Sequence, residues 1–439
     1  MIERIKTLLL TFLVLLSLLQ SFFLAYSMPN FDVRKKFTSD YIMTDPLGPE
    51  EKVENLVFPE QLVLHLGGNK HTVLYPGMTF YNIIVKRLQG RSYDGFQYRS
   101  VSAVDWARIR EENEGVELLF HTPIPVKLLQ RVFPIGDDSV LMNESIRRIW
   151  LYTTKDTKEV RVFFFNAEGD AVYESTSANL TEQDVKQQVE FGRAWTPYKL
   201  VDGAYYVPEQ PIEMQEVTLP FDRITAEQMQ RSLFNDPTVT KNIETGNSEI
   251  YTDVKRGLEV NRGLQWLIYS DPVVQTEGQQ DITSDVTAAV RFINQHGGWN
   301  GRYRVTMPDN MKRDSLNGAA SELGTAIRFQ QYWGSYPIVN TSRFRFGYMQ
   351  VTMQEGTVTS YERSLVQLHQ RAAKKEMRKL AIGDALIKKL KELSKEKPIS
   401  AIDPVYVPIL GKDTVRLLPA WQVKNKDGTT ALLDEAAGK

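Results

Sequence analysis

The chain has 439 residues, of which 42% are hydrophobic and 24% charged, and its formal net charge is −1. This composition is typical of folded, water-soluble domains and not of a polytopic membrane protein, and the length predicts two to four domains. With a net charge near zero, the protein has no overall positive potential that would attract the phosphates of nucleic acid, which argues against nucleic acid as a partner. The absence of cysteine excludes disulfides, thiol catalysis, zinc–cysteine sites and lipoprotein acylation.

The first predicted element is a membrane-spanning helix at Leu8–Tyr26, a stretch without any charged residue. A helix of that length rises about 28 Å, which nearly matches the hydrocarbon core of a bilayer. The small-x-small sequence Ala25–Ser27 leaves a cleavable signal peptide as an alternative. We favour an uncleaved anchor, because the apolar run exceeds the usual signal-peptide core and Phe22 and Phe23 crowd the cleavage site.

The flanking charges do not settle the orientation of this helix, because Arg4 and Lys6 before it are balanced by Arg34–Lys36 after it. No later stretch approaches the length of a second apolar span. A large C-terminal body without a second span favours a single-pass protein of the cell membrane, with a cytoplasmic N-terminus and an extracytoplasmic body. The membrane lipid bilayer is therefore an expected partner.

Small and polar residues gather along one face of the predicted helix. At about 100° per residue, Thr11, Ser17, Ser21 and Ala25 fall within one sector of about 120°. Small residues at four-residue spacing allow two helix backbones to approach closely in lipid. These four residues form the predicted helix–helix contact; the alternative is that they are the small polar residues ordinarily found in single spans.

Turn signals and periodicity divide the rest of the chain into α+β units built on antiparallel sheets with packed helices. The predicted segments are the N-terminal tip and transmembrane helix (1–28), a tether (29–58), an N-terminal α+β domain (59–219), a central α+β domain (220–326) and a C-terminal α+β domain (327–439). A helix followed by a strand meander recurs without a clean sequence repeat, which suggests duplicated modules.

The N-terminal domain is expected to open with a hairpin and to continue mainly as strands. Gln61–Tyr75 alternates apolar and polar residues on the way into a glycine-rich turn, which predicts a hairpin. Helical spacing predicts helices at Met78–Leu88 and Leu180–Phe191. Val116–Phe120 is an expected strand, and Ile146–Ser175 is typical of consecutive strands.

The central and C-terminal domains are expected to mix helices with hairpins. A capping box at Thr225–Gln228 predicts a helix through Phe234, and periodicity predicts another helix at Asp285–Gln295. A long helix is expected at Lys374–Lys395. The expected strands are 249–252, 258–260, 264–269, 343–353, 357–366, 405–410, 414–423 and 429–433.

The search for catalytic and ligand-binding motifs predicts that the chain is not an enzyme. The five histidines are too dispersed for a spacing such as HExxH, and no P-loop, GxGxxG, GxSxG or kinase signature occurs. His65 and His71 flank the first hairpin turn, where an ordinary hairpin is favoured over a metal site. Ser394 and Lys397 match the SxxK spacing of serine acyltransferases but lack the SDN and KTG partners. No catalytic, cofactor-binding or metal-binding residue is expected, and no cofactor.

Two stretches of the sequence carry a resemblance to a known family. Ile5–Leu18, I-K-T-x-L-L-T-x-L-V-L-L-S-L, resembles the opening of the YycH (WalH) family, the membrane-anchored regulators of the WalK/WalR two-component system in Gram-positive bacteria. Leu418–Val423, followed by Asp427 and Gly428, is similar to the closing hairpin of PepSY-like modules, which occur in YycH and in its partner YycI. The chain length, the single apolar span and the lack of cysteine agree with this resemblance.

The resemblance implies an extracytoplasmic body of three domains with PepSY/YycI-like modules at its C-terminal end. It implies association with a YycI-type regulator and with the WalK sensor histidine kinase, whose output controls cell-wall metabolism. It also implies contacts between the transmembrane helix and the kinase, which favours the small-residue face. The alternative from another class is a secreted or anchored PepSY-type protease inhibitor or envelope chaperone, and cleavage after Ser27 would favour it.

Overall fold

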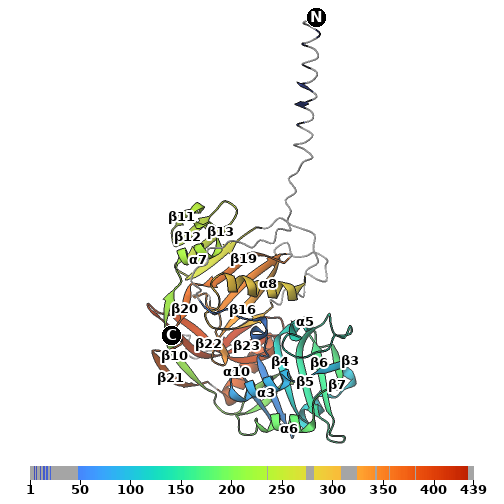
Figure 1. Ribbon diagram of the computed structural model, residues 1–439. Helices are drawn as coiled ribbons and strands as arrows, with labels where there is room; N and C mark the ends of the chain where they lie inside the picture. Colours follow the sequence, from blue (N-terminus) through green and yellow to red (C-terminus); the bar gives the residue numbers. More distant parts are fainter. Residues whose placement is uncertain are drawn as a thin grey trace. The chain divides into compact units, whose positions relative to one another are not determined.

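The computed structural model describes residues 48–433, apart from 235, 273–280, 308–323, 342–343, 355 and 381, together with positions 4, 6, 10, 13, 14, 16, 17 and 20. The chain forms two compact units, Met1–Tyr41 and Ile42–Lys439, and we call the second unit the body. In the described part of the body the strands form three antiparallel sheets, named here the N-terminal, central and C-terminal sheets (Figure 1).

The N-terminal sheet has the strand order β3-β7-β6-β5-β4-β1-β2-β8-β9. Its strands are β1 (Gln61–Leu66), β2 (His71–Leu74), β3 (Tyr93–Ser100), β4 (Glu114–Pro125), β5 (Ser145–Thr153), β6 (Val160–Asn166), β7 (Ala171–Ala178), β8 (Pro197–Val201) and β9 (Tyr205–Pro208). Alternation along β6 buries Phe164 in the same core as side chains of α3 (Thr79–Gln89) and α6 (Glu182–Glu190), and Phe163 against α4 (Trp106–Glu112). The middle of this sheet is therefore buried on both faces.

The central sheet has the order β11-β12-β13-β14-β19-β18-β16-β15, with β17 beside β16. Its strands are β11 (Lys241–Thr245), β12 (Ser248–Thr252), β13 (Gly257–Asn261), β14 (Trp266–Ser270), β15 (Arg302–Thr306), β16 (Thr325–Trp333), β17 (Tyr336–Pro337), β18 (Tyr348–Gln354) and β19 (Thr357–Ser364). The helices α7 (Ala226–Leu233) and α8 (Ile282–Gln295) bury Leu233 and Ile293 in the same core as Tyr251 and Tyr361 of the sheet.

The C-terminal sheet joins strands from distant parts of the chain. β10 (Glu213–Arg223) pairs with β23 (Thr414–Asn425), with β20 (Val366–Leu368) and with β21 (Lys374–Lys379). The strands β22 (Ile399–Leu410) and β24 (Thr430–Leu433) pair with β23, and α10 (Gly383–Glu396) packs Leu386 and Leu390 into the core of this region. The remaining short helices of the described residues are α2 (Val53–Leu56), η1 (Val101–Ala103), α5 (Val126–Leu129) and η2 (Pro237–Val239).

Several of the elements expected from sequence patterns are confirmed. β1 and β2 form the expected hairpin, and α3, α6, α7 and α8 begin and end within about three residues of their expected bounds. The capping box forms as predicted, with the Gln228 N–H donating to Thr225 Oγ1 at 3.2 Å and the Thr225 N–H donating to Gln228 Oε1 at 2.8 Å. Strands β3, β11, β15, β16 and β17 lie outside the elements expected from the sequence.

One expected helix is wrong over its first part. Lys374–Lys379 is the strand β21, which pairs with β10, and α10 begins only at Gly383. Lysine, glutamate, methionine and arginine all favour helices, but β10 offers this segment backbone partners. Arg378 also reaches Glu216 of β10, with 2.9 Å between Nε and Oε2. Tertiary pairing therefore overrides the helix propensity of these residues.

The sheets do not coincide with the expected boundaries at 219/220 and 326/327. β10 crosses the first boundary, and most of its pairing partners lie beyond residue 366. Across the second boundary, β18 and β19 belong to the central sheet and pair with β16 and β14. The three-domain division of the body stays a prediction.

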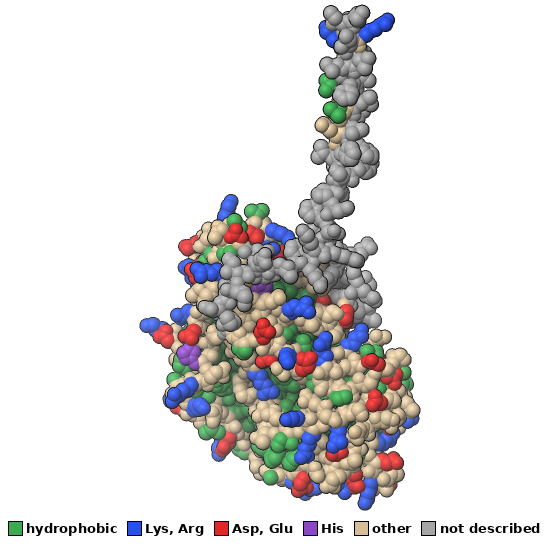
Figure 2. Space-filling model, viewed as in Figure 1, with side chains coloured by type: hydrophobic (Ala, Val, Ile, Leu, Met, Phe, Trp, Pro, Cys, Tyr) green, Lys and Arg blue, Asp and Glu red, His purple; other side chains and the backbone are tan. Residues whose placement is uncertain are grey.

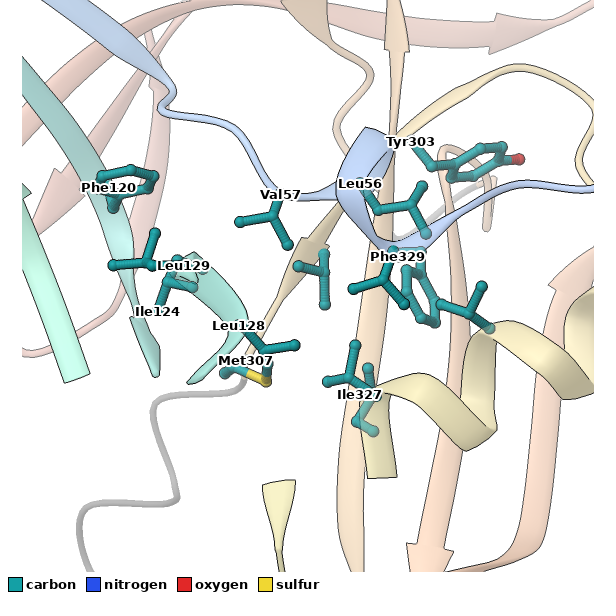
Figure 3. Close-up of a cluster of buried hydrophobic side chains, with 14 of the residues drawn as sticks. Leu56, Val57, Phe120, Ile124, Leu128, Leu129, Tyr303, Met307, Ile327 and Phe329 are labelled. Carbon is teal, nitrogen blue, oxygen red and sulfur yellow. The ribbon is translucent and has the colours of Figure 1, made fainter. Parts of the chain in front are cut away.

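The N-terminal and central sheets share one hydrophobic core. Figure 3 shows side chains from the end of α2 and from the residue after it between two groups that come from the two sheets and from α5. The labelled residues are Leu56, Val57, Phe120, Ile124, Leu128, Leu129, Tyr303, Met307, Ile327 and Phe329, none of them more than 8% exposed. Burial of each large apolar side chain contributes about 1.5–3 kcal/mol, so we expect these two sheets to stay together as one rigid piece.

Candidate functional site

The predicted helix–helix contact lies in the first unit of the chain. Ser17 is helical and exposed, whereas Thr11, Ser21 and Ala25 lie outside the described residues. The apolar side chains described in this helix are 41–65% exposed; they are Leu10, Leu13, Val14 and Leu16. Among the described positions, no helix combines the length and the apolar character needed to cross a membrane. The contact face stays a prediction.

The segment that leads into the body is fastened to the end of α8. Asn294 Oδ1 accepts the Glu51 backbone N–H at 3.0 Å, and Asn294 Nδ2 donates to Glu51 O at 2.9 Å. The same Oδ1 accepts Trp299 Nε1–H at 2.7 Å, and the Trp299 backbone N–H donates to Pro49 O at 3.0 Å. Gly298, with φ +70°, permits this approach, because a Cβ there would lie 2.4 Å from the backbone of the incoming segment. We call Pro49, Glu51, Asn294 and Trp299 the attachment clamp.

A buried ion pair joins the start of β1 to the central sheet. Arg304 Nη1 lies 2.8 Å from Glu60 Oε1, and Arg304 Nε donates to Phe58 O at 2.7 Å. The other carboxylate oxygen of Glu60 accepts the backbone N–H of His121 at 2.9 Å. The arginine side chain is 1% exposed and the glutamate side chain 10%, so water contributes little to holding either charge.

Gln61, the residue after Glu60, connects β1 to the C-terminal sheet through a buried hydrogen bond. Gln61 Nε2 donates to Asp403 Oδ1 at 2.6 Å, and Asp403 Oδ2 lies 3.1 Å from His121 Nδ1 and 3.4 Å from Lys424 Nζ. Burial raises the pKa of Asp403, but the neighbouring His121 and Lys424 outweigh it and hold the pKa well below its usual range. Consecutive residues, Glu60 and Gln61, thus tie three sheets together.

A second buried polar cluster closes the first hairpin. His65 Nδ1 lies 3.0 Å from His71 Nδ1, and His65 Nε2 lies 3.4 Å from Glu117 Oε2 on β4. Burial lowers the pKa of both histidines, to about 3 for His71. Burial also raises the pKa of Glu117, but Arg148, with Nε 3.0 Å from Oε1, outweighs it and lowers the pKa. The imidazoles are therefore neutral at physiological pH and serve as hydrogen-bonding groups of the hairpin.

Ser394 and Lys397, the residues with SxxK spacing, bond to neighbouring groups and not to each other. Ser394 Oγ donates to Lys391 O at 3.1 Å, and Lys397 Nζ donates to Thr429 Oγ1 at 3.2 Å, so no SxxK pair forms. Within the residues that the structure describes, no group of three histidine, aspartate or glutamate side chains could hold a metal ion.

An open depression of about 430 Å³ lies beside the attachment clamp; its lining residues are Glu51, Asn55, Leu56, Gly301, Arg302 and Tyr303.

Two family models match nearly the whole chain. The model for the N-terminal domain of YycH protein matches residues 3–191, and the model for the C-terminal domain of YycH protein matches residues 203–432. The chain is also similar to the two-component system WalR/WalK regulatory protein YycH of Bacillus subtilis (strain 168). The two are 20% identical over 446 aligned positions, which cover 96% of this chain and 94% of the relative.

A solved structure shows the same fold. The crystal structure of YycH from Bacillus subtilis aligns with a TM-score of 0.67 at 16% identity, covering 88% of this chain and 98% of that chain. The shared architecture is a mixed α/β fold of antiparallel sheets with few helices. An uncharacterized protein from Eubacterium rectale ATCC 33656 aligns over 56% of this chain and 87% of that chain at 9% identity. Its TM-score is 0.35, a likeness too slight to support an argument.

Proposed function

The chain belongs to the YycH family, and from this premise we propose that it is a non-enzymatic, membrane-anchored regulator of a WalK-type sensor histidine kinase. The observation that carries the proposal is the match of the two family models to residues 3–191 and 203–432. It is supported by the relative, which is a regulatory protein of the WalR/WalK system. Through the kinase, the protein adjusts cell-wall metabolism.

The proposed anchor is the helix at Leu8–Tyr26, with the N-terminus in the cytoplasm and the body outside the cell membrane. The exposure of Leu10, Leu13, Val14 and Leu16 supports it. Burying each such side chain away from water is worth about 1.5–3 kcal/mol, and insertion into lipid would supply that burial.

Figure 2 shows basic and acidic side chains interspersed over the visible face of the body, which favours protein and lipid partners over nucleic acid.

The attachment clamp supports a route from the body to the anchor. The clamp bonds residues 49–51 to α8, which packs in the core shared by the N-terminal and central sheets. We propose that a partner bound to the body favours one arrangement of the anchor helix beside the kinase helices. A differential contact free energy of about 1–2 kcal/mol changes the balance of two kinase states about 5- to 30-fold.

A YycI-type regulator is the proposed second partner, bound through the body. Its support is the sequence likeness of the closing stretch to PepSY-like modules. That stretch, Leu418–Val423, lies in β23, which pairs with β10, β22 and β24. The PepSY/YycI-like character of this region is part of the proposal.

Reconstitution of the kinase in lipid vesicles tests the proposed function. Kinase autophosphorylation is measured with and without the full-length chain, and again with the YycI-type regulator added. We expect the chain to change the rate of autophosphorylation about 5- to 30-fold. An unchanged rate in both settings would remove the regulatory role.

Enlarging the small-residue face of the anchor is expected to weaken the kinase complex. Ser21→Phe places a ring where two helix backbones are proposed to approach closely. Recovery of the kinase with the detergent-extracted chain should fall several-fold, while tryptophan fluorescence of the body stays unchanged. Leu16→Phe, on the opposite side of the helix, is the matched control and should co-purify as the wild type does. Equal recovery of the kinase with both variants would rule out the proposed face.

Breaking the attachment clamp is expected to uncouple the body from the kinase. Asn294→Ala removes three hydrogen bonds, and the Glu51 N–H and Trp299 Nε1–H lose their acceptor at a cost of about 1–3 kcal/mol. The effect on autophosphorylation should fall several-fold, and protease should cut sooner near residue 50. Asn55→Ala is the control, since the Asn55 side chain donates to the Glu51 carboxylate and to none of the clamp's backbone groups. Regulation that survives Asn294→Ala in full would exclude the clamp as the route.

A further inference from the structure

Arg363 of β19 is a buried arginine that lacks a carboxylate partner among the described residues. It is 1% exposed, and its Nη1 donates to the Tyr361 hydroxyl at 3.2 Å and to Gly298 O at 3.4 Å. Its Nε and Nη2 are buried and have no hydrogen-bond partner within the part of the chain that the structure describes. Arg304, the other fully buried arginine of that part, is paired with Glu60.

The two unpaired nitrogens form the part of the guanidinium group that is best suited to an anion. Nε and Nη2 lie along one edge of the planar group, and such an edge binds a carboxylate through two parallel hydrogen bonds. A buried charge is costly unless it is paired, and arginine cannot avoid that cost by losing its proton. The chemistry of this edge therefore favours an anion as its partner.

Arg363 lines a narrow cavity between the loop that follows α8 and the strands β16, β18 and β19. Gln331 of β16 also lines it, is 4% exposed, and reaches the loop, since a Cβ on Gly301 would lie 2.7 Å from Gln331 Nε2. Figure 3 shows the Tyr303 hydroxyl pointing away from the hydrophobic cluster, and this hydroxyl donates to Asn300 Oδ1 at 2.6 Å. Asn300 therefore offers a ligand its Nδ2–H. The lining residues thus provide N–H donors and include no acidic side chain.

We propose that this cavity binds a small monovalent anion, chloride or a carboxylate of about the size of formate, on the unpaired edge of Arg363. The side-chain amides of Gln331 and Asn300 supply the further donors. Because the cavity is narrow, larger anions are excluded, and the Gln331 side chain has to rotate to admit even a small one. The bound anion provides the counter-charge that Arg304 receives from Glu60.

The proposed anion site lies next to the attachment clamp. Arg363 donates to Gly298 O, and Asn300 directly follows Trp299, whose indole N–H donates to Asn294 Oδ1. An anion held by Arg363 and Asn300 therefore joins the loop that carries part of the clamp to β19. This inference goes beyond the proposed function and does not depend on it.

Thermal unfolding at constant ionic strength tests the anion site. The full-length chain in detergent is heated in sodium gluconate, and chloride or formate replaces the gluconate, which is too large for the cavity, in steps. Tryptophan fluorescence reports the midpoint, Tm. We expect chloride, formate or both to raise the Tm of the wild type by about 1–3 °C and to saturate, because a ligand of the folded chain stabilises it by mass action.

Two arginine variants show whether the rise in Tm comes from Arg363. Arg363→Met removes the guanidinium group and should abolish the rise. Arg328→Met makes the same change at an exposed position of β16 and should keep it. A rise with chloride alone identifies a halide site, and a rise with formate alone identifies a carboxylate site. Equal Tm values in all three salts, or a rise that Arg363→Met retains, overturn the proposal.

Crystals of the wild-type chain decide the matter if Arg363→Met does not fold. They are grown once in sodium bromide and once in sodium formate. Anomalous scattering from bromide or planar formate density beside Arg363 supports the anion site. Water alone beside Arg363 in both crystals overturns it, and either result leaves the proposed function standing.

Discussion

Replacing Arg304 with methionine is expected to lower the free energy of unfolding of the body by about 3–5 kcal/mol. The arginine side chain is 1% exposed and bonds both Glu60 Oε1 and Phe58 O. Methionine fills much of the space but leaves a buried carboxylate without its counter-charge. Urea unfolding of the full-length chain in detergent, followed by tryptophan fluorescence, measures the loss, because all seven tryptophans lie in the body.

Two further variants show whether the loss comes from the ion pair. Arg328→Met makes the same change on β16, where Arg328 is exposed and stacks 4.6 Å from the ring centroid of Tyr348, and should cost less than about 1 kcal/mol. Combining Glu60→Gln with Arg304→Met should recover most of the loss, because no uncompensated charge remains. A loss below about 1 kcal/mol for Arg304→Met alone would contradict the role of this pair in joining two sheets.

Acidification from about pH 7 to about pH 5 is expected to destabilise the body by about 4–6 kcal/mol. Burial lowers the pKa of His65, His71 and His296 below 6.5, to about 3 for His71 and about 4 for His296. Below pH 6.5 the unfolded chain therefore binds more protons than the folded chain, and stability falls as pH falls. Each histidine contributes up to about 1.4 kcal/mol per pH unit.

A single substitution isolates one of these contributions. His296→Gln removes a titrating group whose Nδ1 lies 2.5 Å from Ser232 O, and glutamine retains an amide that can donate there. The slope of unfolding free energy against pH should fall by about 1 kcal/mol per pH unit between about pH 6 and about pH 4.5, because the folded pKa of His296 is about 4. Urea unfolding at several pH values measures it. Stability that is flat or rises on acidification would show that these histidines are not held neutral by the fold.

The candidate site was only partly accessible from sequence patterns. The apolar segment and its small-residue face could be predicted because helical periodicity relates residues a few positions apart, and the face stays a prediction. The attachment clamp could not, since Glu51 and Asn294 are 243 residues apart and neither belongs to a recognisable motif. His65 and His71 were noticed as a pair beside a turn, but Glu117, which completes the cluster, comes from β4.

Local sequence patterns were sufficient for the first hairpin, for α3, α6, α7 and α8, and for the capping box at Thr225, because these depend on residues close together in the chain. Only the folded structure decided which strands become neighbours. It placed Lys374–Lys379 beside β10 as a strand and brought Gln61 to Asp403, 342 residues away. No local period encodes such partners, since long-range pairing depends on the burial and charge of the whole body.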